Sequence, residues 1–143
     1  MVRVNLIEPS ALSDQHLIAE YSEILRLLGF VRKHPDVEGE GTHFLRQPVK
    51  YFSGKLRYLA KRHALLRKEM ANRGFRHSLV PVLKFYPKKR LKDFSPDKKQ
   101  VREIKRRLIE RLQKPPRKNF YRYHSQKVAT AFLVELVRRA KKA

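Results

Sequence analysis

The stretch DQHLIAEYSEILR, residues 14–26, decides the fold because it has the pattern of an amphipathic α-helix. Apolar side chains recur at helical spacing: Leu17, Ile18, Tyr21, Ile24, Leu25 and Leu28. Ser13 is the predicted N-cap and Gly29 the predicted end of this helix. The polar face carries an unusual assortment for so basic a chain: Gln15, His16, Glu20, Glu23 and Arg26. Judged by spacing alone, this polar face is solvated and carries one ion pair that stabilises the helix by a few tenths of a kcal/mol. The alternative is a carboxylate that works on a ligand attracted by the basic surface.

Three more helices are predicted farther along the chain. The second is capped by Ser53, runs to about Arg73 and ends at Gly74. Its apolar side consists of Leu56, Leu59, Ala60, His63, Leu66 and Met70, and its basic side of Lys55, Arg57, Lys61, Arg62, Arg67 and Lys68. The third begins at the Ser95-Pro96-Asp97 signal, ends before Pro115-Pro116, and packs through Val101, Ile104, Leu108 and Leu112. The fourth extends from about Gln126 to Lys141 and packs through Val128, Phe132, Leu136 and Val137.

Between the helices, prolines and glycines predict loops at 30–50 and extended or looped chain at 75–94. Residues 1–12 are expected to be extended or irregular. We therefore predict an all-α fold, a compact single-domain helical bundle with long irregular connections that spans residues 1–143.

Composition indicates the class of partner. The chain has 35 Lys and Arg against 13 Asp and Glu, a net charge of +22. Such a charge favours a polyanion, and because the basic residues are spread along the whole chain, we expect nucleic acid and no membrane partner. The absence of cysteine excludes disulfides, thiol catalysis and thiolate metal sites, and no motif such as HExxH appears. No metal or cofactor is expected. No apolar run approaches the length of a membrane span, and no secretory signal is seen, so an intracellular, cytoplasmic protein is expected.

Two further features bear on chemistry. The segment RKNFYRYHSQK, residues 117–127, interleaves four cations with three aromatics. Aromatics stack on bases while cations hold phosphates, although Phe120 and Tyr121 in the core would satisfy the pattern equally well. The α-amino group has a pKa near 7.7–8.0, so a useful fraction is uncharged at neutral pH. Beside a carboxylate it could form a Schiff base with a sugar aldehyde, but every protein has an N-terminus.

These segments resemble a known family. MVRVNL followed by DQHLIAEYSEILR and GFVRKH is similar to the N-terminal region of the pyrimidine-dimer DNA glycosylases of the phage endonuclease V type. KYFSGKLRYLAKRHALLRKEMANRGF resembles the second helix of that family, and FYRYHSQK its C-terminal stretch. Residues 76–113 match poorly. The chain departs from the family pattern at three positions. The family favours a small residue such as threonine where this chain has Val2, arginine where it has Ser22, and glycine where it has Ser125. The predicted helix at about 126–141 also extends beyond the usual end of the family.

The resemblance implies a small DNA-repair glycosylase with a coupled abasic-site lyase (an endonuclease activity), no cofactor and damaged double-stranded DNA as substrate. Val2 would supply the attacking amine after loss of Met1. Glu23 would stabilise the sugar cation and assist proton transfer, with nearby cations lowering its pKa, whereas Glu20 would be structural. The predicted nucleic-acid contacts are Arg3, Gln15, His16, Arg26, Arg32, Lys33, Arg117, Lys118, Tyr121, Arg122, Tyr123 and Lys127. A monomer associated with the nucleoid is expected.

One alternative function stays open at this point. The charge of +22 and the basic middle section suit a non-enzymatic RNA-binding protein that is ribosome-associated and uses the same scaffold to bind ribosomal RNA. The joint presence of Arg3, Gln15, His16, Glu23 and Arg26 favours the enzyme.

Overall fold

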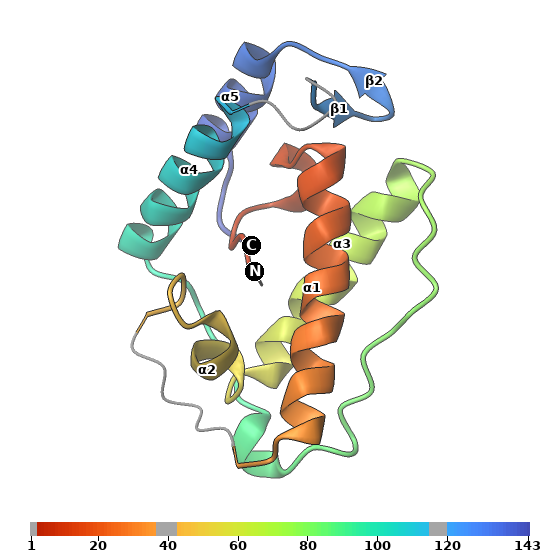
Figure 1. Cartoon of the computed structure of the whole chain (residues 1–143), viewed down its shortest axis with the longest axis vertical. Helices are drawn as coiled ribbons and strands as arrows, with labels where there is room; N and C mark the ends of the chain where they lie inside the picture. Colours follow the sequence, from red (N-terminus) through yellow and green to blue (C-terminus); the bar gives the residue numbers. More distant parts are fainter. Residues whose placement is uncertain (1–2, 37–42, 115–119) are drawn as a thin grey trace.

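A computed structural model describes residues 3–36, 43–114 and 120–143, and it is compact and mostly helical (Figure 1). The predicted all-α class is confirmed. The elements in chain order are η1 (Pro9–Ala11), α1 (Asp14–Lys33), α2 (Pro48–Phe52), α3 (Leu56–Asn72), η2 (Lys88–Arg90), α4 (Lys98–Leu112), β1 (Arg122–Tyr123), β2 (Gln126–Lys127) and α5 (Thr130–Arg139). Helix α1 packs on α3 and α4 packs on α5, so the core lies between two helix pairs.

Helix α1 begins as predicted and ends later than predicted. The Ser13 hydroxyl accepts the N–H of His16 at 3.1 Å, which confirms the cap. Gly29 does not end the helix, which continues to Lys33. Glycine in a helix costs only about 1 kcal/mol relative to alanine, and burial of Val31 in the next turn offsets that cost. The buried stripe therefore extends through Leu27 and Val31, while Ile18 is exposed.

Helix α3 corrects two predictions. It starts at Leu56, because Ser53 belongs to the end of the short helix α2, where its hydroxyl donates to the carbonyl of Lys50 at 2.9 Å. Arg62, predicted on the exposed basic side, is only 1% exposed. Its guanidinium forms a buried ion pair with Glu20 of α1. Gly74 follows the helix at a φ of 80°, as expected for a C-terminal glycine.

Helices α4 and α5 begin later than predicted. Asp97, not Ser95, is the N-cap of α4, and it forms a capping box with Gln100. The predicted stripe of α4 is confirmed, with Ile104, Leu108 and Leu112 buried and Val101 partly buried. Helix α5 starts at Thr130, because residues 122–127 form a hairpin of two antiparallel strands. Its buried side chains are Leu133, Val134 and Val137, and the predicted core residue Phe132 is exposed.

The hairpin turn is fastened to the start of α1. His124 and Ser125 have φ values of 51° and 65°, a left-handed conformation that costs non-glycine residues about 1–2 kcal/mol each. Both N–H groups donate to the Asp14 carboxylate, at 3.0 Å and 2.7 Å. Asp14 also pairs with the buried Arg73 at the end of α3, at 2.9 Å. One carboxylate thus joins the hairpin to both α1 and α3.

The first and last described segments meet in the interior (Figure 1). Ile7 and Lys142 form an antiparallel bridge. The N–H of Glu8 donates to the carbonyl of Lys141 at 2.8 Å, and the N–H of Ala143 donates to the carbonyl of Leu6 at 3.0 Å. None of the helices in the described ranges has the length and hydropathy needed to cross a bilayer.

Candidate active site

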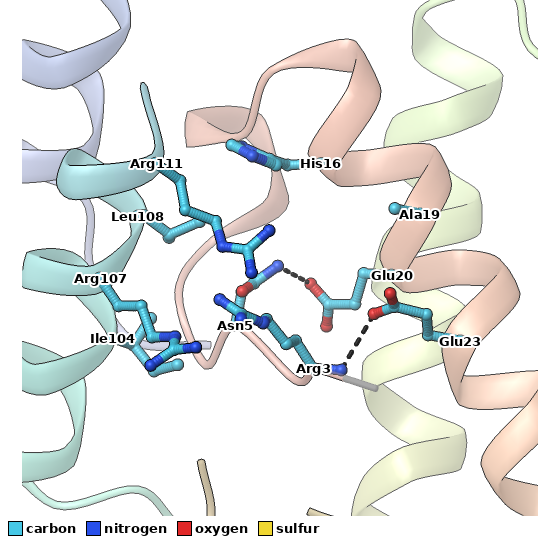
Figure 2. Close-up of a pocket in the computed structure, with 10 residues that line it drawn as sticks. All are labelled: Arg3, Asn5, His16, Ala19, Glu20, Glu23, Ile104, Arg107, Leu108 and Arg111. Carbon is cyan, nitrogen blue, oxygen red and sulfur yellow. Dashed lines mark hydrogen bonds between the residues drawn. The ribbon is translucent and has the colours of Figure 1, made fainter. Parts of the chain in front are cut away.

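A pocket of about 150 Å³ lies between α1, α4 and the N-terminal segment that passes between them (Figure 2). Its lining residues are Arg3, Asn5, His16, Ala19, Glu20, Glu23, Ile104, Arg107, Leu108 and Arg111. Three predicted site residues, Arg3, His16 and Glu23, are therefore brought together. They share the pocket with a second carboxylate on α1, that of Glu20, and with the guanidinium groups of Arg107 and Arg111 on α4.

The backbone N–H of Arg3 donates to Oε2 of Glu23 at 2.9 Å (Figure 2). The segment is held there because the residues that follow, including Val4 and Leu6, are buried in the core. Burial raises the pKa of Glu23, and the charge of Glu20 adds to this rise, outweighing the opposing effects of the Arg3 N–H and side chain. The Arg3 cation lowers this pKa as expected, but burial outweighs it, so the expected net lowering of the pKa is wrong. A raised carboxyl pKa is suited to a group that exchanges a proton near neutral pH.

Glu20 is the second carboxylate of the pocket, and its hydrogen bonds are structural, as expected. Nε and Nη2 of Arg62 donate to it at 2.7 Å and 3.0 Å, and Nδ2 of Asn5 donates to Oε1 at 2.8 Å. Both members of the ion pair are almost fully buried. The pair fixes the wall of the pocket because it ties α1 to α3 and to the N-terminal segment.

The opposite wall is cationic. Arg107 and Arg111 are one turn apart on α4, and their side chains extend toward the pocket (Figure 2). Burial and the charges of these two residues lower the pKa of Arg3 to about 10. Burial, Arg111 and Arg3 lower the pKa of His16 to about 4, so its imidazole is neutral at pH 7. His16 can thus offer the pocket a ring and hydrogen bonds, but no positive charge.

Two further predicted residues, Gln15 of α1 and Tyr121, lie close to residues of the pocket without lining it. Gln15 donates to the carbonyl of Phe120 at 3.3 Å and accepts the N–H of Arg122 at 3.0 Å. Tyr121 is buried beside His16, with ring centroids 5.2 Å apart, and its hydroxyl donates to the carbonyl of Arg111 at 3.0 Å. These residues therefore brace the walls, and their contact with phosphates stays a prediction.

Other predicted contacts lie on the surface or outside the described residues. The Tyr123 hydroxyl donates to the carbonyl of Ser10 at 2.7 Å. Several predicted cations are exposed outside the pocket lining: Arg26, Arg32, Lys33, Arg122 and Lys127. Val2, Arg117 and Lys118 lie outside the described residues.

Sequence reasoning missed Asn5, Arg107 and Arg111. The two arginines carried a usable signal, because positions 107 and 111 are four residues apart and directly precede the apolar residues Leu108 and Leu112. Asn5 carried no such signal, since its role depends on Glu20, which is 15 residues away. The described residues hold no cluster of His, Cys, Asp and Glu suited to a metal ion.

The pocket thus combines a half-buried carboxylate with several guanidinium groups, which are chemically suited to contact an anionic group. Residues 1–80 match the family model of the pyrimidine dimer DNA glycosylases. The chain belongs to this family, whose name denotes a DNA-repair enzyme that acts on damaged DNA. The matched segment supplies Arg3, His16 and Glu23, while the α4 wall lies beyond it.

Proposed function

We propose that this chain breaks the glycosidic bond of a damaged base in duplex DNA at pyrimidine dimers and then cleaves the strand as an abasic-site lyase. The attacking group would be the α-amine of Val2, exposed by removal of Met1. The observation that carries the proposal is the hydrogen bond of the Arg3 N–H to Glu23, at 2.9 Å. That nitrogen belongs to the peptide bond that follows Val2, so the carboxylate is hydrogen-bonded to the residue directly after the proposed nucleophile.

The chemistry proceeds in two stages. The amine lone pair attacks C1′ of the deoxyribose, and the glycosidic bond breaks with its electron pair leaving on the base, which takes up a proton. Loss of a proton from nitrogen and opening of the sugar ring give an imine. Removal of a proton from C2′ then drives cleavage of the C3′–O bond, and the phosphate leaves.

Glu23 suits both stages. Ionised, it stabilises positive charge that develops on the sugar, and protonated, it can donate to the ring oxygen. Its raised pKa brings the two forms closer in free energy. The guanidinium groups of Arg107 and Arg111 extend toward the same pocket (Figure 2) and would hold phosphates of the damaged strand.

Borohydride trapping tests the proposal. The purified protein is incubated with duplex DNA that contains one abasic site, reduced with borohydride, and analysed by intact mass and peptide mapping. We expect a covalent adduct on Val2 of a chain that lacks Met1. Glu23→Gln should bind the duplex but accumulate less cleaved strand, whereas Glu135→Gln, on the exposed face of α5, should match the wild type.

Absence of the adduct would refute the lyase mechanism. Recovery of the protein with ribosomal particles, together with no cleavage of abasic DNA, would instead favour the RNA-binding alternative. The glycosylase step is scored separately on duplex DNA that contains a pyrimidine dimer. Because the detached pyrimidine stays joined to its neighbour through the dimer, cleavage of its glycosidic bond is read as free base released after photoreversal of the dimer.

A further inference from the structure

The connection between α3 and α4 contains a basic and apolar segment that the pocket does not use. We call residues 76–92 the basic strap. It holds six Lys and Arg and no Asp or Glu. Four apolar side chains in it are more than half exposed: Leu79, Val80, Val82 and Phe85. In Figure 1 the strap runs along one side of α1 and α3, while α4 with its pocket wall lies on the other side.

The exposed strap is held in place by two tyrosines. The N–H of Leu79 donates to the Tyr21 hydroxyl at 3.0 Å, and that hydroxyl faces the carbonyl of Leu79 at 3.4 Å. The Tyr86 hydroxyl donates to the carbonyl of Leu28 at 2.6 Å. Both hydrogen bonds attach the strap to α1, at Tyr21 and at Leu28. They fix the strap backbone between residues 79 and 86, which carries the exposed apolar side chains.

Phe85 is an exposed aromatic residue of the strap, and two cations lie beside its ring. It is 60% exposed, with the Arg32 guanidinium 5.0 Å and the Lys84 ammonium 5.1 Å from the ring centroid. An exposed aromatic ring with cations beside it suits unpaired nucleotides, since a base stacks on the ring while the cations contact the flanking phosphates. Paired bases in a duplex are stacked on one another and do not offer this contact.

We propose that the basic strap is a second nucleic-acid site that binds single-stranded nucleic acid by base stacking on Phe85. Charge favours this partner over a protein, because the strap adds Lys88 and Lys89 to the two cations at the ring and contains no acidic residue. The site is separate from the proposed active site. Phe85 also lies beyond the residues that match the family model.

A single-tryptophan reporter tests the proposal directly, because the chain contains no tryptophan. Phe85→Trp places the only indole at the proposed platform, and Phe132→Trp places it at an exposed aromatic position on α5 as the matched control. Both proteins are titrated with twelve-nucleotide oligouridylate, oligothymidylate and a twelve-base-pair duplex at equal salt. We expect both single strands to quench Phe85→Trp, with little quenching of Phe132→Trp. The two single strands compare RNA with DNA as the source of the unpaired bases.

Affinity supplies the second measurement. Removal of one aromatic platform typically costs about 1–3 kcal/mol per stacked base. Phe85→Ala should therefore weaken single-strand binding, measured by fluorescence anisotropy, by about fivefold or more. Phe132→Ala should bind as the wild type does. Cleavage of abasic duplex DNA by Phe85→Ala should be unchanged, so failure of this proposal is distinguishable from failure of the lyase.

Equal single-strand affinity of Phe85→Ala and wild type would overturn the proposal and leave a protein as the occupant of the strap. Equal quenching of the two tryptophan variants would overturn it as well. Circular dichroism of each variant verifies that the helices are intact.

Discussion

Replacement of Glu20 by glutamine tests how the wall of the pocket is held. Glu20 accepts three hydrogen bonds, at 2.7 Å and 3.0 Å from Arg62 and 2.8 Å from Asn5. Glutamine has one acceptor oxygen and one amide group that only donates. In either orientation of the amide, the NH₂ group faces an N–H donor of Arg62, and the buried guanidinium loses its counter-charge.

The cost follows from burial. Arg62 is 1% exposed and cannot turn to water, so its charge stays uncompensated. Removal of one partner of a buried ion pair costs about 3–5 kcal/mol. A domain of this size is stable by about 5–15 kcal/mol, so Glu20→Gln should lower the Tm by about 10 °C or more.

Urea denaturation followed by circular dichroism measures this loss. The matched control is Glu135→Gln, which breaks the exposed pair with Arg139 at 2.8 Å. Those side chains are 48% and 79% exposed, so the control should cost no more than about 0.5 kcal/mol. A loss below about 1 kcal/mol for Glu20→Gln would refute the reasoning, because Arg62 would then have another source of compensation.

Four further outcomes are expected. Glu23→Gln should slow single-turnover cleavage of abasic duplex DNA by about 10²–10⁴-fold, the usual contribution of a proton-transfer group, with no loss of Tm. Ser125→Gly should raise the free energy of unfolding by about 0.5–1 kcal/mol, measured in urea, because it relieves a left-handed serine. Arg111→Ala should reduce the slope of log K against log salt for duplex DNA by about 1, measured by anisotropy. The Tm should fall as pH decreases from about 6.5 to about 4. Burial, with the charges of nearby arginines, lowers the pKa of both His63 and His16 to about 4 in the fold, so the unfolded chain takes up the protons first.

Each of these has a contrary result. Wild-type cleavage by Glu23→Gln would remove this carboxylate from the mechanism. A less stable Ser125→Gly protein would show that the turn is not strained. An unchanged salt slope in Arg111→Ala would place the phosphates elsewhere. A Tm that does not change over the acid range would refute the pH prediction, and a Tm that changes equally in His63→Gln would show that this imidazole does not contribute to the pH dependence.

The periodicity of apolar residues predicted most of the fold, because helix burial depends on neighbours three and four residues apart. That local rule located α1, α3 and α4 and the packing stripe of α4. The periodicity rule failed where contacts between residues far apart in the sequence determine burial or local structure. Arg62 has a position typical of a basic surface. Its burial is explained by distant partners, the Glu20 carboxylate 42 residues away and the carbonyl of Ile7. The hairpin at 122–127 depends on Asp14, more than 100 residues earlier in the chain.

The residues of the candidate site likewise fall into those that the sequence predicted and those that depend on long-range contacts. The resemblance of the N-terminal segments located Arg3, His16 and Glu23, and the structure places them around one pocket. Arg107 and Arg111 were missed because the packing of α4 against the N-terminal segment is a long-range contact. The direction of the Glu23 pKa shift was also missed, since it depends on burial that a list of neighbouring charges does not contain.

The bridge between Ile7 and Lys142 sets an order of events during synthesis. A ribosome makes the chain from its N-terminus, so residues 6–8 lack their antiparallel partner until residues 141–143 have emerged. Arg3 belongs to the same segment, and its contact with Glu23 is completed only when that segment is fixed. Closure of so long a loop is slow compared with helix formation. The two helix pairs can therefore form before the pocket does, and a chain truncated before residue 141 should retain helices while lacking an ordered site.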